Sequence, residues 1–253
     1  MLPSVRGKPL NGAGALAVRA ARLGFAALGI AAIVEAVVDR TGSLVNFFSF
    51  FTIESNLMAI VVLLVGGAAD PRSRGWAWGR GAVTFFMVVT GIVHAVLLAN
   101  ADVGLIAAWV NSVLHEVLPA VLLVDWLCFP PWPFGPVAGP VGGPAGGPAG
   151  GPAGGPAGGI AGGPAGGGRA WPALAWLAFP LAYLAYSLGR GAAVGWYPYP
   201  FLDPRHPGGY GRVALYCVVL AVLMALLALG IAAAGRWRAA RGAARSPVPA
   251  PGK

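Results

Sequence analysis

Several polar side chains fall inside long apolar runs of this sequence, where their spacing matches a helix. Thr52 and Asn56 stand four residues apart, as do Asn111 and His115, so each pair would lie on one helical face. A hydroxyl and an imidazole are the minimal pair for nucleophilic attack assisted by a general base. Thr52 and His115 could form such a pair, although spacing alone does not show that they meet.

Other polar residues are candidates for the same site. His94 follows Thr90 by four residues, and Glu35 lies near the end of the first apolar run. Ionisable residues inside a membrane-spanning segment are costly, so by default they face the bundle interior and mark a functional site. We expect a site around Thr52 and His115 that is lined by Asn56, Asn111, His94, Glu35, Tyr197 and Asp203.

Metal and cofactor binding find little support in the sequence. Cys128 and Cys217 are isolated from each other and from other ligand types, so no metal-ligand spacing exists. We expect no metal and no cofactor. A haem with His94 and His115 as axial ligands is an alternative, because two histidines at one depth of a bundle permit it.

The elements that position these residues are expected to lie within a lipid bilayer. The chain is 57% hydrophobic and 10% charged, with a mean hydropathy of +0.73, whereas about a quarter of a soluble domain is charged. A bilayer core about 30 Å thick needs roughly 20 apolar residues per helix. We predict an all-α, polytopic membrane protein with six transmembrane helices, and with five or seven as the alternatives. The six windows are 14–38, 48–67, 81–99, 104–129, 171–189 and 211–234.

The distribution of basic residues predicts the orientation. With six spans, thirteen of the 17 Lys and Arg residues fall on one side, which the positive-inside rule makes cytoplasmic. Both termini are therefore expected in the cytoplasm, and the protein in the cell membrane. The net charge of +9 suits an anionic inner leaflet, and no basic stripe with interleaved aromatics points to nucleic acid. Asp125 and the basic segment 72–80 are expected at the inner surface without a chemical role.

A change of composition divides the chain. Residues 1–133 hold the first four predicted helices, and residues 169–237 hold the last two. Between them, residues 134–168 form a Gly-Gly-Pro-Ala array that cannot bury apolar surface, and its period of four excludes collagen, which has a period of three. We predict a disordered cytoplasmic linker there, and a disordered tail over residues 238–253.

Four motifs carry a resemblance to a known family: F-F-S-F-F-T-I-E-S-N over 47–56, T-G-I-V-H over 90–94, N-S-V-L-H-E-V-L-P over 111–119 and G-W-Y-P-Y-P-F-L-D over 195–203. Together they resemble the bacterial Pr-six-Pr family of membrane proteins. More distantly, the pattern is similar to the eukaryotic androgen-induced and androgen-dependent membrane proteins, threonine hydrolases that act on fatty acid esters of hydroxy fatty acids. This resemblance implies Thr52 and His115 as the catalytic pair. The residues after Thr52 follow the bacterial pattern, and the spacing around Trp196 departs from the eukaryotic one.

Two functions of different classes follow from these observations. The first is an intramembrane lipid-ester hydrolase with membrane lipids as partners, in which Thr52 attacks and His115 acts as the base. The second is a non-enzymatic lipid or small-molecule binder, or a proton relay through Glu35, His94 and His115 in the same pocket. Hydrolysis requires the threonine hydroxyl, whereas a relay requires only the ionisable groups.

Reporter fusions test the predicted orientation. Alkaline phosphatase, which is active outside the cytoplasm, should be active when fused after Asp102 or after Asp203. A fluorescent protein that matures in the cytoplasm should be bright when fused within residues 142–168, because the basic residues concentrate on that side. A linker found outside would overturn the orientation.

Overall fold

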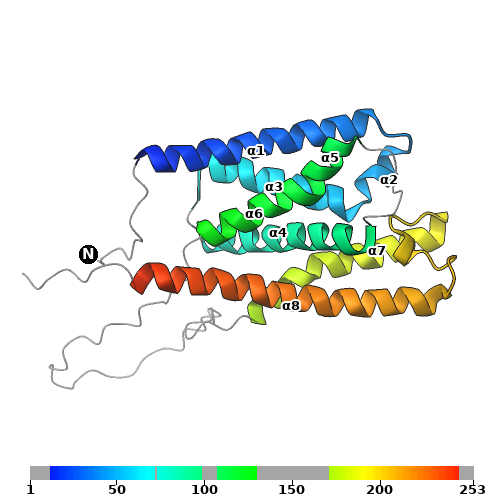
Figure 1. Ribbon diagram of the computed structural model, residues 1–253. Helices are drawn as coiled ribbons and strands as arrows, with labels where there is room; N and C mark the ends of the chain where they lie inside the picture. The colour runs from blue at the N-terminus through cyan, green and yellow to red at the C-terminus, as the bar shows by residue number, and fades with distance from the viewer. Residues whose placement is uncertain (1–11, 72, 99–106, 130–170, 245–253) are drawn as a thin grey trace, which may run out of the picture.

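The computed structural model describes residues 12–71, 73–98, 107–129 and 171–244, and every regular element in these ranges is a helix (Figure 1). The elements in chain order are α1 Gly12–Val38, α2 Leu44–Phe48, α3 Phe51–Ala68, α4 Arg74–Val93, the π-helical turn η1 His94–Leu98, α5 Ala108–Ser112, the π-helical turn η2 Val113–Val117, α6 Leu118–Cys128, the 3₁₀ helix η3 Trp171–Leu177, α7 Ala178–Val194, the 3₁₀ turn η4 Pro200–Leu202 and α8 Gly209–Ala244. The predicted linker, residues 134–168, lies outside the described residues.

Six helical stretches are long and apolar enough to cross a membrane, as the sequence predicts: Gly12–Val38, Phe51–Ala68, Arg74–Leu98, Ala108–Cys128, Pro172–Val194 and Gly209–Arg238. The start of α1 and the end of α8 lie at the same end of the bundle, as an even number of crossings requires (Figure 1). The predicted disordered tail, 238–253, needs a correction in its first part, because α8 continues to Ala244, and residues 245–253 lie outside the described residues. The alanines and arginines in this part of α8 favour the helix.

The second predicted helix, 48–67, is interrupted near its start, because α2 ends at Phe48 and α3 begins at Phe51. The Ser49 hydroxyl donates back to the Val45 carbonyl at 2.6 Å, a bond that competes with continuation of α2. The spanning helix α3 then begins at Phe51, so the predicted start at residue 48 is corrected. Thr52 consequently lies in the first turn of α3, where backbone N–H groups have no acceptor within the helix.

Two π-helical turns carry the histidines. η1 begins at His94, and η2 contains His115. In η2 the backbone N–H of Leu118 donates to the carbonyl of Val113, five residues before it. Pro119 explains the wider turn, because proline has no N–H and its ring clashes with the carbonyl four residues earlier, which here is that of His115.

The helix α4 approaches η2 closely at Gly91. A Cβ atom at this position would lie 3.1 Å from the carbonyl oxygen of His115 and 3.3 Å from Cβ of Pro119. Because glycine has no Cβ, the turn η1 can lie against η2. The imidazole rings of His94 and His115 stack there, with their centroids 4.0 Å apart.

A buried ion-pair network closes the opposite end of the bundle. Asp125 of α6 accepts from Nε of Arg22 at 2.8 Å and from Nη2 of Arg80 at 2.6 Å. Arg22 also donates to Asp70 at 2.9 Å and to the carbonyl of Gly66 at 3.0 Å, near the end of α3. The expected surface positions of Asp125 and Arg80 are therefore wrong, since both side chains are buried. Each guanidinium needs a carboxylate partner once it leaves water, and Asp125 serves two of them.

Removing the shared carboxylate should destabilise the bundle. Asp125→Asn leaves Arg22 and Arg80 buried without their common counter-charge, and breaking a buried ion pair in this way costs about 3 to 5 kcal/mol. Thermal unfolding in detergent, followed by tryptophan fluorescence, measures the loss. Asp70→Asn is the matched control, because Asp70 is 43% exposed and Arg22 keeps Asp125. Asp70→Asn should lower the free energy of unfolding by about 1 kcal/mol or less. Equal losses of stability for the two variants would contradict this account of the network.

Candidate functional site

The structure brings the Thr52 hydroxyl and the His115 imidazole together. Oγ1 of Thr52 lies 3.4 Å from Nε2 of His115, and both residues are buried. Nδ1 of His115 lies 3.0 Å from the backbone carbonyl of Asn111. A carbonyl only accepts, so Nδ1 donates, and Nε2 of the neutral ring presents its lone pair to the threonine hydroxyl. A general base needs this tautomer.

Asn56 connects the segments that carry the two residues. Its side-chain nitrogen donates to the carbonyl of Thr52 at 2.8 Å and to the carbonyl of Leu114 at 3.1 Å. The Leu114 carbonyl lacks a donor in its own helix, because η2 diverts the N–H of Leu118 and Pro119 has none. The amide therefore satisfies a buried acceptor and sets the distance between α3 and η2.

Tyr199 reaches the threonine from the loop between α7 and α8. Its hydroxyl lies 3.4 Å from Oγ1 of Thr52 and accepts from the Thr52 backbone N–H at 3.3 Å. Burial raises the pKa of Tyr199, so the phenol keeps its proton and can donate it to a negatively charged oxygen. The dipole of α3 adds partial positive charge at the same point. The phenol, which this N–H holds in place, is therefore a candidate donor to an oxyanion.

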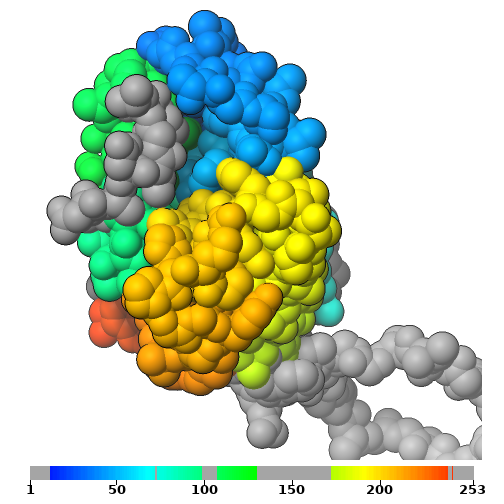
Figure 2. Space-filling view, turned by 90° about the vertical axis from the view of Figure 1, so that its right-hand side faces the viewer, coloured from blue at the N-terminus to red at the C-terminus, as the bar shows by residue number. Residues whose placement is uncertain are grey.

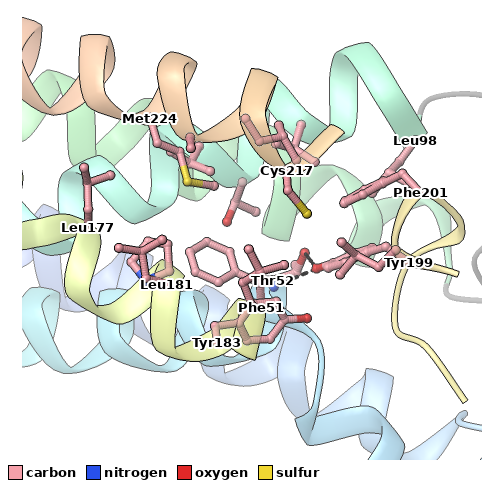
Figure 3. Close-up of a pocket in the computed structure, with 18 residues that line it drawn as sticks. Phe51, Thr52, Leu98, Leu177, Leu181, Tyr183, Tyr199, Phe201, Cys217 and Met224 are labelled. Carbon is pink, nitrogen blue, oxygen red and sulfur yellow. Dashed lines mark hydrogen bonds between the residues drawn. The ribbon is translucent and has the colours of Figure 1, made fainter. Parts of the chain in front are cut away.

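Two cavities meet at Thr52 and Tyr199, which line both. The first has a volume of about 190 Å³ and lies between α3, α4, α7 and α8, behind apolar side chains. In Figure 3, Leu177 and Met224 lie to one side of Thr52 and Tyr199 to the other. The second has a volume of about 290 Å³, lies between the end of α1, α2 and η2, and includes His115. We call them the apolar cavity and the polar cavity.

The polar cavity lies at the end of the bundle that Figure 2 faces. There the segment around α2, in blue, borders the loop before α8, in yellow. The contact includes an edge-to-face pair of the Phe50 and Trp196 rings, with centroids 5.6 Å apart. Both residues line the cavity, so the site is assembled where segments distant in sequence meet.

His94 and Glu35, two of the predicted lining residues, have different positions. Nε2 of His94 lies 3.4 Å from the side-chain nitrogen of Asn111. An amide nitrogen only donates, so Nε2 accepts and Nδ1 carries the ring proton. Nδ1 is buried and, among the described residues, has no hydrogen-bond partner. Glu35 is exposed on α1 and lines neither cavity, so the structure does not bring it to the site.

Tyr197 and Asp203 support the loop and do not line either cavity. Tyr197 packs over Gly191, where a Cβ atom would overlap the tyrosine ring. The carboxylate of Asp203 accepts hydrogen bonds from Nε and Nη2 of Arg205, the one from Nη2 at 2.6 Å. These hydrogen bonds lower the pKa of the carboxyl to about 2. The motif over 195–203 identified the loop that contributes to the site but not Tyr199 as the contributing residue. The prolines on either side of Tyr199 make the backbone irregular, so helical or strand periodicity cannot predict where its side chain points.

The stacked histidines do not fit an axial pair. Their rings lie nearly face to face, with 21° between the ring planes, whereas axial ligands point their nitrogens at an iron between them. A porphyrin has no room in a 4.0 Å stack, so the haem alternative is set aside. Within the described ranges, no group of three or more His, Cys, Asp or Glu side chains is placed to hold a metal ion.

Comparisons with protein-family models, with curated proteins and with solved structures give no match for this chain. The resemblance to the Pr-six-Pr family therefore rests on the four motifs alone. These motifs meet in space, since they supply Thr52, His94, His115 and Tyr199 to one site. What the site can do must be argued from its geometry.

Proposed function

We propose that this chain is a multi-pass protein of the cell membrane that hydrolyses lipid esters, with Thr52 as the nucleophile and His115 as the general base. The observation that carries the proposal is the 3.4 Å contact between Oγ1 of Thr52 and the proton-free Nε2 of His115. Six apolar spans support membrane insertion, and the excess of basic residues at one end supports cytoplasmic termini. The four motifs support membership of the Pr-six-Pr family and a kinship with the threonine hydrolases.

The reaction proceeds through an acyl-enzyme. Oγ1 of Thr52 attacks the ester carbonyl carbon while Nε2 of His115 takes the hydroxyl proton. The carbonyl oxygen becomes an oxyanion, which the Tyr199 hydroxyl stabilises. The bond to the alcohol oxygen then breaks, and His115 returns its proton to that oxygen. Water, deprotonated by the same imidazole, attacks the acyl carbon. The bond between that carbon and Oγ1 then breaks, His115 returns the proton to Oγ1, and the fatty acid leaves.

The backbone carbonyl of Asn111 takes the place of the third group of a catalytic triad. It accepts from Nδ1 of His115, so it fixes the tautomer and orients the ring. A carbonyl carries no full charge and stabilises the imidazolium less than a carboxylate would. Among the described residues, no carboxylate bonds to His115. The arrangement suits slow turnover of a concentrated membrane substrate.

The apolar cavity suits the acyl chain of such an ester. Phe51 and Leu181 lie on its α3 and α7 sides, and Met224 of α8 lies across from them (Figure 3). A chain held there places its carbonyl carbon at Thr52, where the two cavities meet. Because lipid tails are as apolar as the cavity, transfer of the chain from the bilayer adds little energy, and the fit of the chain to the cavity should govern binding.

A non-enzymatic lipid binder is the second candidate, because the apolar cavity would serve it equally well. A proton relay has less support. Glu35 is exposed on α1, and Nδ1 of His94 has no partner among the described residues. Binding differs from hydrolysis in that it does not need the Thr52 hydroxyl.

Loss of either catalytic group should abolish turnover. Thr52→Ala and His115→Ala should each lower kcat by about 10³-fold or more, and the double variant should lose little beyond either single one, because the residues act as a unit. Thr52→Ser keeps the hydroxyl and should retain activity. Turnover is measured on a panel of lipid esters in detergent micelles, including an ester of a hydroxy fatty acid.

Thr84→Ala is the matched control for this series. Thr84 is buried in α4 and lines neither cavity, so its truncation removes the same atoms away from the site. Melting temperatures of all variants show whether they fold. Full turnover by Thr52→Ala, or none by the wild type across the panel, would leave the binder as the function.

The two tyrosines of the loop should behave differently. Tyr199→Phe removes a donor to the oxyanion and should lower kcat by about 10²- to 10³-fold with little change in KM. Tyr197→Phe removes a hydroxyl from the same loop outside both cavities, so its kcat should match that of the wild type. Equal effects of the two substitutions would mean that the loop, not the Tyr199 hydroxyl, matters.

A further inference from the structure

The polar cavity has a positive end. It extends from the catalytic residues Thr52 and His115 to the segment after α1, where Arg40, Ser43 and Asn46 line it. The hydroxyl and amide groups there can donate hydrogen bonds, and the guanidinium adds a full charge. The mechanism of ester cleavage uses none of these three side chains.

Arg40 has no counter-charge among the residues that the structure describes. Its Nη1 donates to the carbonyl of Val37, whereas its Nε is buried and has no hydrogen-bond partner within the described ranges. In the part of the chain that the structure describes, ion pairs involve only the arginines at positions 22, 80 and 205. A buried donor without an acceptor is unfavourable unless a ligand supplies the acceptor.

Arg190 adds a second positive charge next to two residues that line the polar cavity. Its Nη2 donates to Oδ1 of Asn46 at 2.7 Å, and its guanidinium lies 4.9 Å from the centroid of the Trp196 ring. Asn46 and Trp196 both line the polar cavity. Nη1 of Arg190 is also buried without a partner among the described residues. Two guanidiniums, each with a buried nitrogen that has no partner among the described residues, make this region attractive to an anion.

We infer that the polar cavity binds the anionic group of an amphiphile, a phosphate or a carboxylate, and that Arg40 recognises it. The inference rests on the proposed function for the rest of the ligand: the acyl chain occupies the apolar cavity and the ester lies at Thr52. Guanidinium groups bind both anions through two parallel hydrogen bonds. A ligand without the anionic group leaves Nε of Arg40 without an acceptor, so the cavity selects against it.

Protection of Cys217 measures binding without turnover. Cys217 lines the apolar cavity, whereas Cys128 is exposed. Modification of Cys217 by N-ethylmaleimide therefore reports an empty cavity, and modification of Cys128 is the internal reference, both read by mass spectrometry. The probes are dodecyl phosphate, dodecanoate and dodecanol, added to the full chain in a neutral detergent.

The anionic probes should protect Cys217 at concentrations about tenfold or more below that of dodecanol, as expected for charge-assisted hydrogen bonds. Whichever anion protects at the lower concentration identifies the group as phosphate or carboxylate. Arg40→Gln should remove the preference and leave protection by dodecanol unchanged. Arg40→Lys, which keeps the charge but not the planar fork, should weaken the preference. Arg236→Gln makes the same charge change at the far end of α8 and should bind as the wild type does.

An Arg40→Gln protein that still prefers the anionic probes, or a wild type that binds dodecanol equally well, would overturn the inference. Melting temperatures identify variants that fold, and the milder Arg40→Lys decides the matter if Arg40→Gln does not. The same measurements in Thr52→Ala separate this question from catalysis. If no ester is hydrolysed but the preference and its loss persist, the anion site stands in a binding protein.

Discussion

The side chain of Asn56 donates to the carbonyls of Thr52 and Leu114, and the rest of the site depends on these two hydrogen bonds. A carbonyl without a donor is costly in an apolar bundle, and the turn η2 creates one at Leu114. The amide that satisfies it also holds Thr52, the proposed nucleophile. The separation of Thr52 from His115 is therefore set by bonds that folding itself requires, and the 3.4 Å contact between them follows from it.

Each of the three groups at the proposed site comes from a departure from regular helix. Thr52 follows the break between α2 and α3, His115 lies in a π-helical turn, and Tyr199 lies in an irregular loop between prolines. A regular apolar helix uses all of its backbone groups internally. Only where that pattern fails do N–H groups, carbonyls and side chains become free to converge on one point, and π-helical turns occur often at functional sites for this reason.

The sequence alone predicted the six spans, because bilayer thickness fixes the length of an apolar run and little else must be known. Helical spacing also placed polar residues on shared faces. It did not distinguish Tyr199 from Tyr197, since side-chain directions in an irregular loop follow from tertiary contacts. Nor did it show that Asp125 is buried: a carboxylate near a helix end has the same local pattern whether it meets water or two arginines from distant helices, as it does here with Arg22 and Arg80.

The π-helical turn η2 holds one residue more than an α-helical turn would, and this changes the phase of the helix on either side of it. A related chain with one residue fewer between Asn111 and Pro119 would carry its histidine about 100° further around the helix axis, away from α3. Correct alignment of such a relative would need a single-residue gap in the middle of a helix, where gaps are ordinarily penalised. A sequence motif of fixed length over 111–119 would not match that relative, even if its helices were arranged in the same way.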